Sequence, residues 1–295
     1  MRYRFIEMHR ARWPLALMCR VLEVHRQGYH RWRKGRDPEQ EKIRQELEVL
    51  IATIFTSSRG TYGVRRIYNE LKSKGKNAGI KLVGRIMREQ GLRAKGKRKY
   101  RPTTDSSKTT APAKNLLKQH GALDGQDQAW VSDFTELPCR RGKAYAVAIM
   151  DLYTRRILAI LVASSMKTDT LLEAFDVAVA TRGRRKLRQT IFHSDRGVQF
   201  NAHAFRDTLA KHDFRQSMSG TGNCYDNAAM ESFWARMKTE IGLRTVFENV
   251  QHARRVISEW TYVFYNRMRI HSGINYMPPV QFENHISSLN SEQAH

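Results

Sequence analysis

Cysteine is scarce in this sequence, and long apolar runs are missing. Cys19, Cys139 and Cys224 are spread over 295 residues, and none belongs to a CxxC pair. An odd number of widely spaced cysteines argues against a disulfide framework and against a structural zinc site. No run of about 18 apolar residues is present to span a bilayer. We therefore expect a cytoplasmic protein in a reducing compartment, with no membrane partner.

Acidic residues are also in the minority. The chain has 52 Lys and Arg against 28 Asp and Glu, which gives a formal net charge of +24. A positive field of this size favours a polyanion, so nucleic acid is the first partner to consider. The alternative is a basic protein whose charge only keeps it in solution. The hydrophobic content of 41% is enough for at least one sizeable core.

Helical patterns fill the first hundred residues. Residues 15–33 predict a compact helix-turn-helix. Asp37, followed by Pro38, predicts the start of a longer helix, because a carboxylate caps free amides and proline fits the first turn. A second helical pair is expected at residues 63–74 and 79–90, closed by Gly91.

The second of these paired helices has a basic face and an apolar face. Lys81, Arg85 and Arg88 recur at helical spacing, and Ile80 and neighbouring apolar residues occupy the other face. A solvated charged surface is the alternative interpretation, but the helix-turn-helix context favours phosphate contact. The predicted DNA-binding residues of this region are Arg65, Arg66, Lys81, Arg85, Arg88, Lys97, Arg98 and Lys99.

Beyond a polar stretch the periodicity changes. Three short apolar runs at 129–137, 143–151 and 155–163 predict antiparallel strands, and helices then alternate with two further short strands. This order predicts an α/β ribonuclease-H-like domain with a mixed five-stranded sheet and flanking helices, preceded by an all-α helix-turn-helix region. The expected division is a small helix-turn-helix (1–36), a helical DNA-binding domain (37–100), a linker (101–127), a catalytic domain (128–285) and a polar tail (286–295).

Three carboxylates stand where this topology can bring them together. Asp133 interrupts the first strand, Asp195 follows the strand TIFH, and Glu231 lies in a later helix. A single Asp is more often a cap or turn residue, but three in these positions predict a site for two magnesium ions that assist displacement at phosphorus. Manganese is expected to substitute for magnesium.

The residue blocks around these acids resemble a known family. The segments WVSDFTEL, HSDRGVQF and GNCYDNAAMESFWARMKTE, with 35 residues between Asp195 and Glu231, are similar to the second-frame transposases of the IS-three group of bacterial insertion sequences. The similarity extends to TYGVRRIYNELKSKGKNAGIKLVGRIMREQGLRA and FYNRMRIHSGINYMPPVQF. These transposases are relatives of retroviral integrases.

The resemblance implies a function. Asp133, Asp195 and Glu231 would hold the magnesium ions, and Lys238 would contact DNA from the same helix face. Similar enzymes nick an element end with water and then use the freed 3′-hydroxyl to attack a second phosphodiester. The implied partners are double-stranded DNA, as terminal inverted repeats and target, and further copies of the chain assembled on it. Such a bacterial protein would be associated with the nucleoid.

The resemblance also leaves alternatives open. Active members are usually fused to an upstream-frame segment with its own helix-turn-helix and leucine zipper, so this chain could be a catalytic half that is inactive without an upstream-frame protein partner. A DNA-binding regulator and a nuclease that cuts without joining are the other two interpretations. An oligonucleotide strand-joining assay separates a regulator, a nuclease and a transposase.

Several single residues have two interpretations. Asp226 competes with Glu231 for the place of third metal ligand, although its position suits a helix cap. His193 is either a general base or, more in keeping with a strand end, a hydrogen-bonded scaffold. Near the C-terminus, Arg267, Arg269 and His271 belong to a polar cluster that we expect to bind phosphate.

Overall fold

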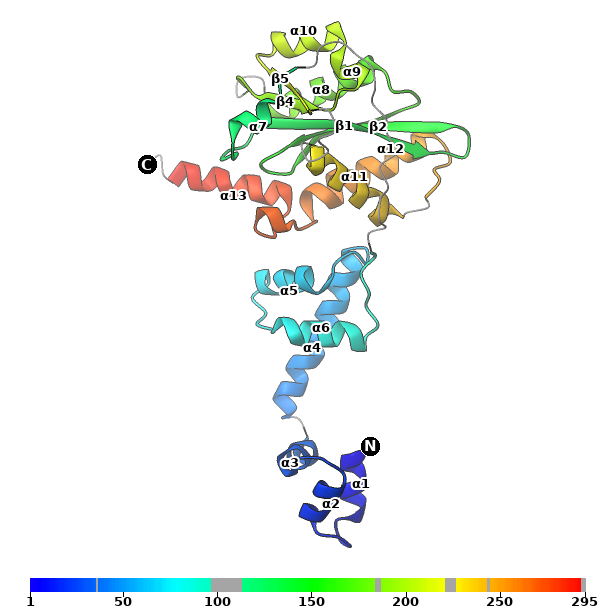
Figure 1. The fold of residues 1–295 in the computed structure, drawn as a ribbon, viewed down its shortest axis with the longest axis vertical. Coiled ribbons are helices and arrows are strands. Elements are labelled where there is room, and N and C mark those ends of the chain that lie inside the picture. Colours follow the sequence, from blue (N-terminus) through cyan, green and yellow to red (C-terminus); the bar gives the residue numbers. More distant parts are fainter. Residues whose placement is uncertain (36, 97–112, 184–186, 221–226, 243–244, 293–295) are drawn as a thin grey trace.

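The computed structural model describes residues 1–295 apart from 36, 97–112, 184–186, 221–226, 243–244 and 293–295. Figure 1 shows an elongated molecule, in which two helical parts lie in line below a larger part built on a β-sheet. Among the described residues, no helix combines the length and the apolar content needed to cross a membrane.

The first part is a three-helix unit formed by α1 (Arg2–His9), α2 (Leu15–Val21) and α3 (Arg26–Lys34). Helices α2 and α3 agree with the predicted helix-turn-helix, whereas α1 was not predicted. Its pattern is weak because Ile6 is its one buried residue and no side chain caps its N-terminus. Ile6 packs with Met18, Cys19 and Tyr29 in a small core of its own.

The second part contains α4 (Pro38–Ser57), α5 (Val64–Ser73) and α6 (Ile80–Glu89). Asp37 caps α4 as predicted, accepting a hydrogen bond from the Glu39 amide at 3.2 Å. The expected apolar face of α6 needs one correction. Val83 and Met87 are buried, but Ile80 is 43% exposed because it begins the helix, beyond the cover of α4 and α5.

The third part is a five-stranded mixed sheet in the order β3-β2-β1-β4-β5. Its strands are β1 (Ala129–Pro138), β2 (Lys143–Asp151), β3 (Ile157–Ala163), β4 (Ile191–Ser194) and β5 (Arg215–Met218). Strands β1 to β3 pair antiparallel, and β4 joins β1 and β5 in parallel. The sheet order, with β1 between β2 and β4, agrees with the predicted ribonuclease-H-like fold.

Helices cover both faces of this sheet (Figure 1). One face packs against α8 (Thr168–Arg182), α9 (Val198–Asn201) and α10 (His203–Lys211), and the other against α11 (Ala228–Ile241) and α12 (Val250–Glu259). Because side chains alternate along a strand, Trp130 of β1 faces α8 whereas Val131 faces α11.

The remaining elements frame the sheet. Helix α7 (Leu116–His120) lies within the expected linker, and α12 continues through a π-helical segment, Trp260–Tyr265, and a 3-10 turn, Ser272–Ile274. Helix α13 runs from Pro279 to Glu292. The predicted polar tail from residue 286 thus begins within α13, which continues to Glu292.

Candidate active site

Asp133 lies near the middle of β1, on the sheet face that α11 covers. It has the same orientation as Val131 and Leu137, which belong to the core beneath that helix. Its Oδ1 accepts a hydrogen bond from the Phe134 amide at 2.9 Å. The side chain is half-buried, so it is positioned firmly while one side remains open.

Asp195 follows the last residue of β4, which is the strand next to β1. The parallel register pairs Val131 with His193, and extending it by two residues sets Asp195 beside Asp133. The Gly197 amide donates to Asp195 Oδ1 at 2.9 Å. Although protein atoms surround the carboxylate closely enough to desolvate it, the residue as a whole is exposed.

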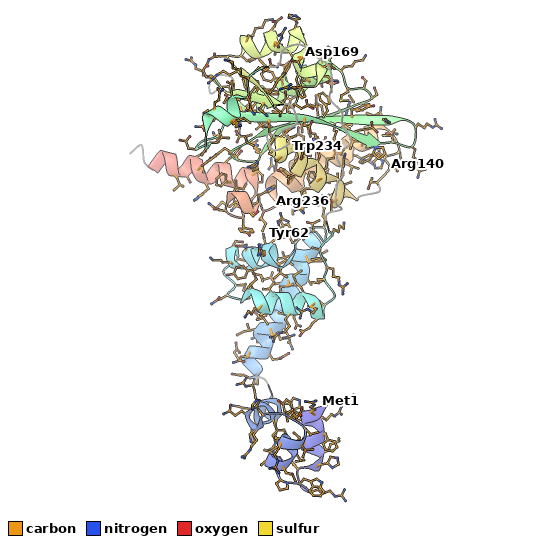
Figure 2. All side chains as sticks on the ribbon, in the orientation of Figure 1. Met1, Tyr62, Arg140, Asp169, Trp234 and Arg236 are labelled. Carbon is orange, nitrogen blue, oxygen red and sulfur yellow. The ribbon has the colours of Figure 1, made fainter. Side chains whose placement is uncertain are left out.

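Glu231 comes from the first turn of α11, above the same face of β1. It is exposed, while Phe233 and Trp234 of the same helix are buried. Trp234, marked in Figure 2, lies one turn after Glu231. Its indole N–H is near enough to lower the pKa of Asp133 but makes no hydrogen bond of standard geometry. Sequence reasoning did not find this contact between Trp234 and Asp133.

The three carboxylates are electrostatically coupled. Burial, the charge of Asp195 and the charge of Glu231 together raise the pKa of Asp133 to about 7. Burial also raises the pKa of Asp195. Within the described part of the chain, no lysine, arginine or histidine forms an ion pair with Asp133, Asp195 or Glu231. Lys238 is coupled electrostatically to Asp133, but none of the three acids is held in an ion pair with a described residue.

The donor chemistry of this group fits a divalent cation, because magnesium and manganese prefer carboxylate oxygens. Its spacing is looser than that of a loaded site. Among the described residues, no group of three or more Asp, Glu, His or Cys side chains is already arranged to hold a metal ion. Coordination by all three acids would therefore require their side chains to move closer together.

Lys238 lies on the same side of α11 as Glu231, two turns further along. Its Nζ donates to Thr135 Oγ1 of β1 at 2.7 Å. Burial lowers the pKa of Lys238, and the charges of Asp133 and Glu136 oppose that shift. This ammonium group therefore stands beside the acidic group, in contact with the strand that carries Asp133.

His193 is a scaffold residue. It is fully buried, with its Nδ1 2.8 Å from Ser217 Oγ and its Nε2 3.1 Å from Ser219 Oγ. Both ring nitrogens are thus engaged with serines on and beside β5. His193 joins β4 to β5 and thereby supports the strand end at which Asp195 begins.

The predicted DNA-binding residues of the helical region are mostly at the surface. Arg65, Lys81, Arg85 and Arg88 are exposed, and Arg66 is half-buried. Lys97, Arg98 and Lys99, and likewise Asp226, lie outside the described residues. Asn227, which precedes α11, makes no capping hydrogen bond through its side chain.

The C-terminal cluster needs a correction. Arg267 is exposed, as expected of a phosphate ligand, but Arg269 is 1% exposed and forms a buried ion pair with Glu240 at 2.9 Å. His271 lies against Arg269, and burial together with that positive charge lowers its pKa well below the usual value. Arg269 is therefore an internal group, so its expected role as a direct DNA contact is wrong, whereas His271 is half-buried and its DNA contact stays a prediction.

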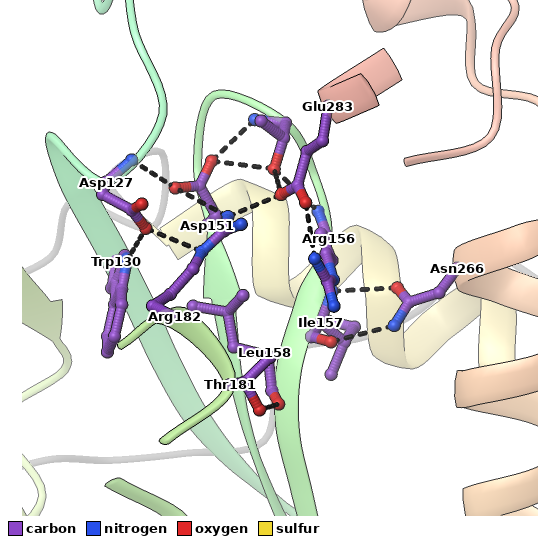
Figure 3. A network of polar contacts seen from close by, with 11 residues as sticks. Asp127, Trp130, Asp151, Arg156, Ile157, Leu158, Thr181, Arg182, Asn266 and Glu283 are labelled. Carbon is purple, nitrogen blue, oxygen red and sulfur yellow. Dashed lines mark hydrogen bonds and ion pairs between the residues drawn. The ribbon is translucent and has the colours of Figure 1, made fainter. Parts of the chain in front are cut away.

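A second acidic group lies where β1 begins and β2 ends (Figure 3). Asp127, Asp151 and Glu283 surround Arg182, the last residue of α8, at 2.8, 3.6 and 2.5 Å. Arg156 pairs with Glu283 at 2.6 Å. These contacts fasten α13 to the sheet and pair the acids with arginines, although burial still raises the pKa of Asp151.

Comparison with known proteins agrees with this architecture. Residues 124–224 and 212–279 match two family models described as integrase core domains, and residues 42–100 match an HTH-like domain. The chain is 34% identical over 286 residues to the transposase InsF for insertion sequence IS3A of Escherichia coli (strain K12), which covers 96% of this chain and 99% of that protein.

This chain is a member of the IS3 family of transposases.

Another relative is a 31 kDa protein of insertion element IS600 from Shigella sonnei, 38% identical over 267 residues, covering 90% of this chain and 97% of that protein. Among solved structures, the catalytic core domain of HTLV-2 integrase in complex with magnesium has a TM-score of 0.41 and 13% identity, covering 53% of this chain and 95% of that one. The IS3-family relatives extend over both the helical parts and the sheet domain. The family membership therefore applies to the whole chain and not to one domain of it.

Proposed function

We propose that this transposase cleaves the ends of an insertion sequence and joins them to new DNA, using Asp133, Asp195 and Glu231 to hold two magnesium ions. The observation that carries the proposal is that Asp133 stands among like charges and forms no ion pair with a described residue: burial first, and then the charges of Asp195 and Glu231, raise its pKa to about 7. A protein gains nothing in stability by leaving carboxylates crowded and unpaired. Such an arrangement is useful when a cation is to be bound there.

The metal ions would supply activation of the attacking oxygen and stabilisation of the leaving oxygen, first with water and then with a 3′-hydroxyl as the attacking group. The chain's own contribution is positional. Strands β1 and β4 fix Asp133 and Asp195 side by side, and α11 presents Glu231 from above. Manganese is expected to replace magnesium, because it accepts the same oxygen ligands.

Lys238 provides a positive charge next to this acidic group. Its hydrogen bond to Thr135 holds the ammonium group close to β1. We infer that it binds a phosphate of the DNA strand beside the one that reacts. This contact would orient the strand and would offset part of the repulsion between DNA and the three acids.

The helical region would find the element's terminal inverted repeats. Helix α6 exposes Lys81, Arg85 and Arg88 on one face while Val83 and Met87 anchor the other face in the core. A basic helix of this kind, the second of a helix pair, is suited to the major groove. Two ends must be held at once, so we infer that copies of the chain assemble on DNA. An upstream-frame protein partner would join this assembly. We expect the transposase to act in the cytoplasm, associated with the nucleoid.

A strand-joining assay tests the proposal. The probe is a labelled duplex carrying the DNA that flanks the coding sequence, incubated with supercoiled target and Mg²⁺. We expect wild type to nick and join, Glu231→Gln to do neither, and Asp207→Asn, which changes an exposed acid on α10, to match wild type. Cutting without joining would indicate a nuclease, and binding without cutting a regulator or a catalytic half; each of these results contradicts the proposal.

A further inference from the structure

The helix-turn-helix part and the sheet domain meet at a junction built around Tyr62. Its hydroxyl donates to the Met268 carbonyl at 3.3 Å and accepts from the Ile270 amide at 2.8 Å. Ile270 is buried in the core of the helical part, and Arg59 pairs with Glu259 at 2.6 Å. Tyr62 precedes α5 by two residues, so the N-terminus of α5 lies at this junction.

Arginines gather at the junction from both sides. Arg66 comes from the first turn of α5, with its guanidinium 5.7 Å from the centre of the Tyr62 ring. Arg236 comes from α11, and Figure 2 shows it on the side of the sheet domain that faces Tyr62. The positive charge of Arg269 lowers the pKa of both Arg66 and Arg236.

These charges are not balanced. Glu240 is the acid that acts on both Arg66 and Arg236, but Arg269 already engages its two carboxylate oxygens at 2.9 to 3.1 Å. Arg66 and Arg236 form no ion pair with any described residue, and the buried Nε of Arg66 has no hydrogen-bond partner there. Burial and the neighbouring arginines lower the pKa of Arg66 to about 10.

We propose that Arg66 and Arg236 together bind one backbone phosphate of double-stranded DNA at the junction between the helix-turn-helix part and the catalytic domain. Two guanidinium groups that meet at one junction, with no ion-paired acid of their own among the described residues, can present several N–H donors to a single anion. A phosphodiester supplies the missing negative charge. This inference rests on the proposed function only for the identity of the anion as DNA.

The position gives the contact a consequence for catalysis. Arg236 belongs to the same helix as Glu231 and Lys238, whereas Arg66 belongs to the unit whose helix α6 exposes Lys81, Arg85 and Arg88. One phosphate held between them would fix the register of the duplex with respect to both units. The distance along DNA from the repeat that α6 reads to the bond that is cut would be set in this way.

The test measures the affinity of the full chain for the flanking-DNA duplex by fluorescence anisotropy over a series of salt concentrations. The variants are Arg66→Gln, Arg236→Gln, the double variant, and Arg188→Gln as a matched control. Arg188 is an exposed arginine before β4, at the opposite end of that strand from Asp195. We expect each single variant to bind about tenfold more weakly and its salt dependence to be shallower by roughly 0.9 in log–log slope.

The double variant should lose less than the product of the two single losses, because both side chains serve one phosphate. If these arginines had only a structural role, replacing either one would lower the melting temperature. Without DNA, removing one of several crowded positive charges should leave the melting temperature unchanged or raised, and inorganic phosphate should stabilise wild type more than the double variant.

Affinities equal to that of Arg188→Gln, losses that simply multiply, or a lowered melting temperature in both single variants would each overturn the shared phosphate site. These readouts do not depend on strand joining. If wild type failed to join DNA, the proposed function would fall while the phosphate and duplex measurements would still decide this inference.

Discussion

The acids around Arg182 and the acids around Asp133 belong to one domain, but only the first group forms ion pairs with described basic residues. In the first group, Asp127, Asp151 and Glu283 converge on an arginine. Although burial alone would raise the pKa of Glu283, its contacts with Arg182 and Arg156 lower it. In the second group no described basic residue forms an ion pair with the acids, and the pKa of Asp133 rises to about 7.

The difference separates structural acids from acids that await a ligand. The Arg182 group is complete in itself, since each carboxylate has donors within the fold, and it joins α8, the sheet and α13 (Figure 3). The Asp133 group is incomplete, and its repulsion is a cost in the metal-free protein. Burial of acids alone would not distinguish the two groups; the presence or absence of positive partners does.

The largest effect on stability should follow from removing Arg182. Arg182→Met leaves three inward-facing carboxylates without their shared cation, and breaking a buried ion pair on one side costs about 3–5 kcal/mol. We expect the free energy of unfolding in urea to fall by that amount. The matched change Arg188→Met, at an exposed position outside the group, should have almost no effect. If Arg182→Met had the same urea midpoint as wild type, the ion pairs around Arg182 would not stabilise the fold.

A smaller loss is expected for Glu283→Gln, about 2 kcal/mol at pH 7, because the amide keeps the shape but loses charged contacts. The sign of the pH dependence follows from the lowered pKa of Glu283. Its contribution is fully present above the ordinary pKa of 4.5 and is lost as the pH falls through the lower folded value. Unfolding curves of wild type and variant should therefore converge in acid. A difference that stayed constant down to pH 2 would rule out the ion pairs as its source.

The smallest effect, of opposite sign, is expected for Asp133→Asn in metal-free buffer. Because the folded pKa of Asp133 is raised from 3.8 to about 7, the wild type loses stability from this group as the pH rises between those values. After allowance for solvent screening, the variant should be more stable by roughly 1 kcal/mol at pH 8 and equal to wild type near pH 4. Thermal unfolding at the two pH values checks this; a variant less stable at pH 8 would mean that Asp133 is a structural acid.

Much of the candidate site could be predicted from sequence because its residues interrupt simple patterns. Asp133 breaks an apolar strand, and Asp195 ends one, so the sheet topology alone brings them together. The partnership of Arg269 could not be predicted, since Glu240 lies 29 residues away on another helix and nothing local shows that both are buried. Arg236 was missed for a related reason: its significance depends on a helix-turn-helix part that approaches it only in the folded chain.

The most direct test of the central claim is a Mn²⁺ titration of the full-length protein, followed by the water-proton relaxation that bound Mn²⁺ enhances. Wild type, Asp133→Asn and Asp127→Asn should be compared, the last changing an acid of the Arg182 group. We predict that Asp127→Asn binds Mn²⁺ as wild type does and that Asp133→Asn loses this binding. Undiminished binding in Asp133→Asn, or its loss in Asp127→Asn, would contradict the assignment of the metal site to the Asp133 group.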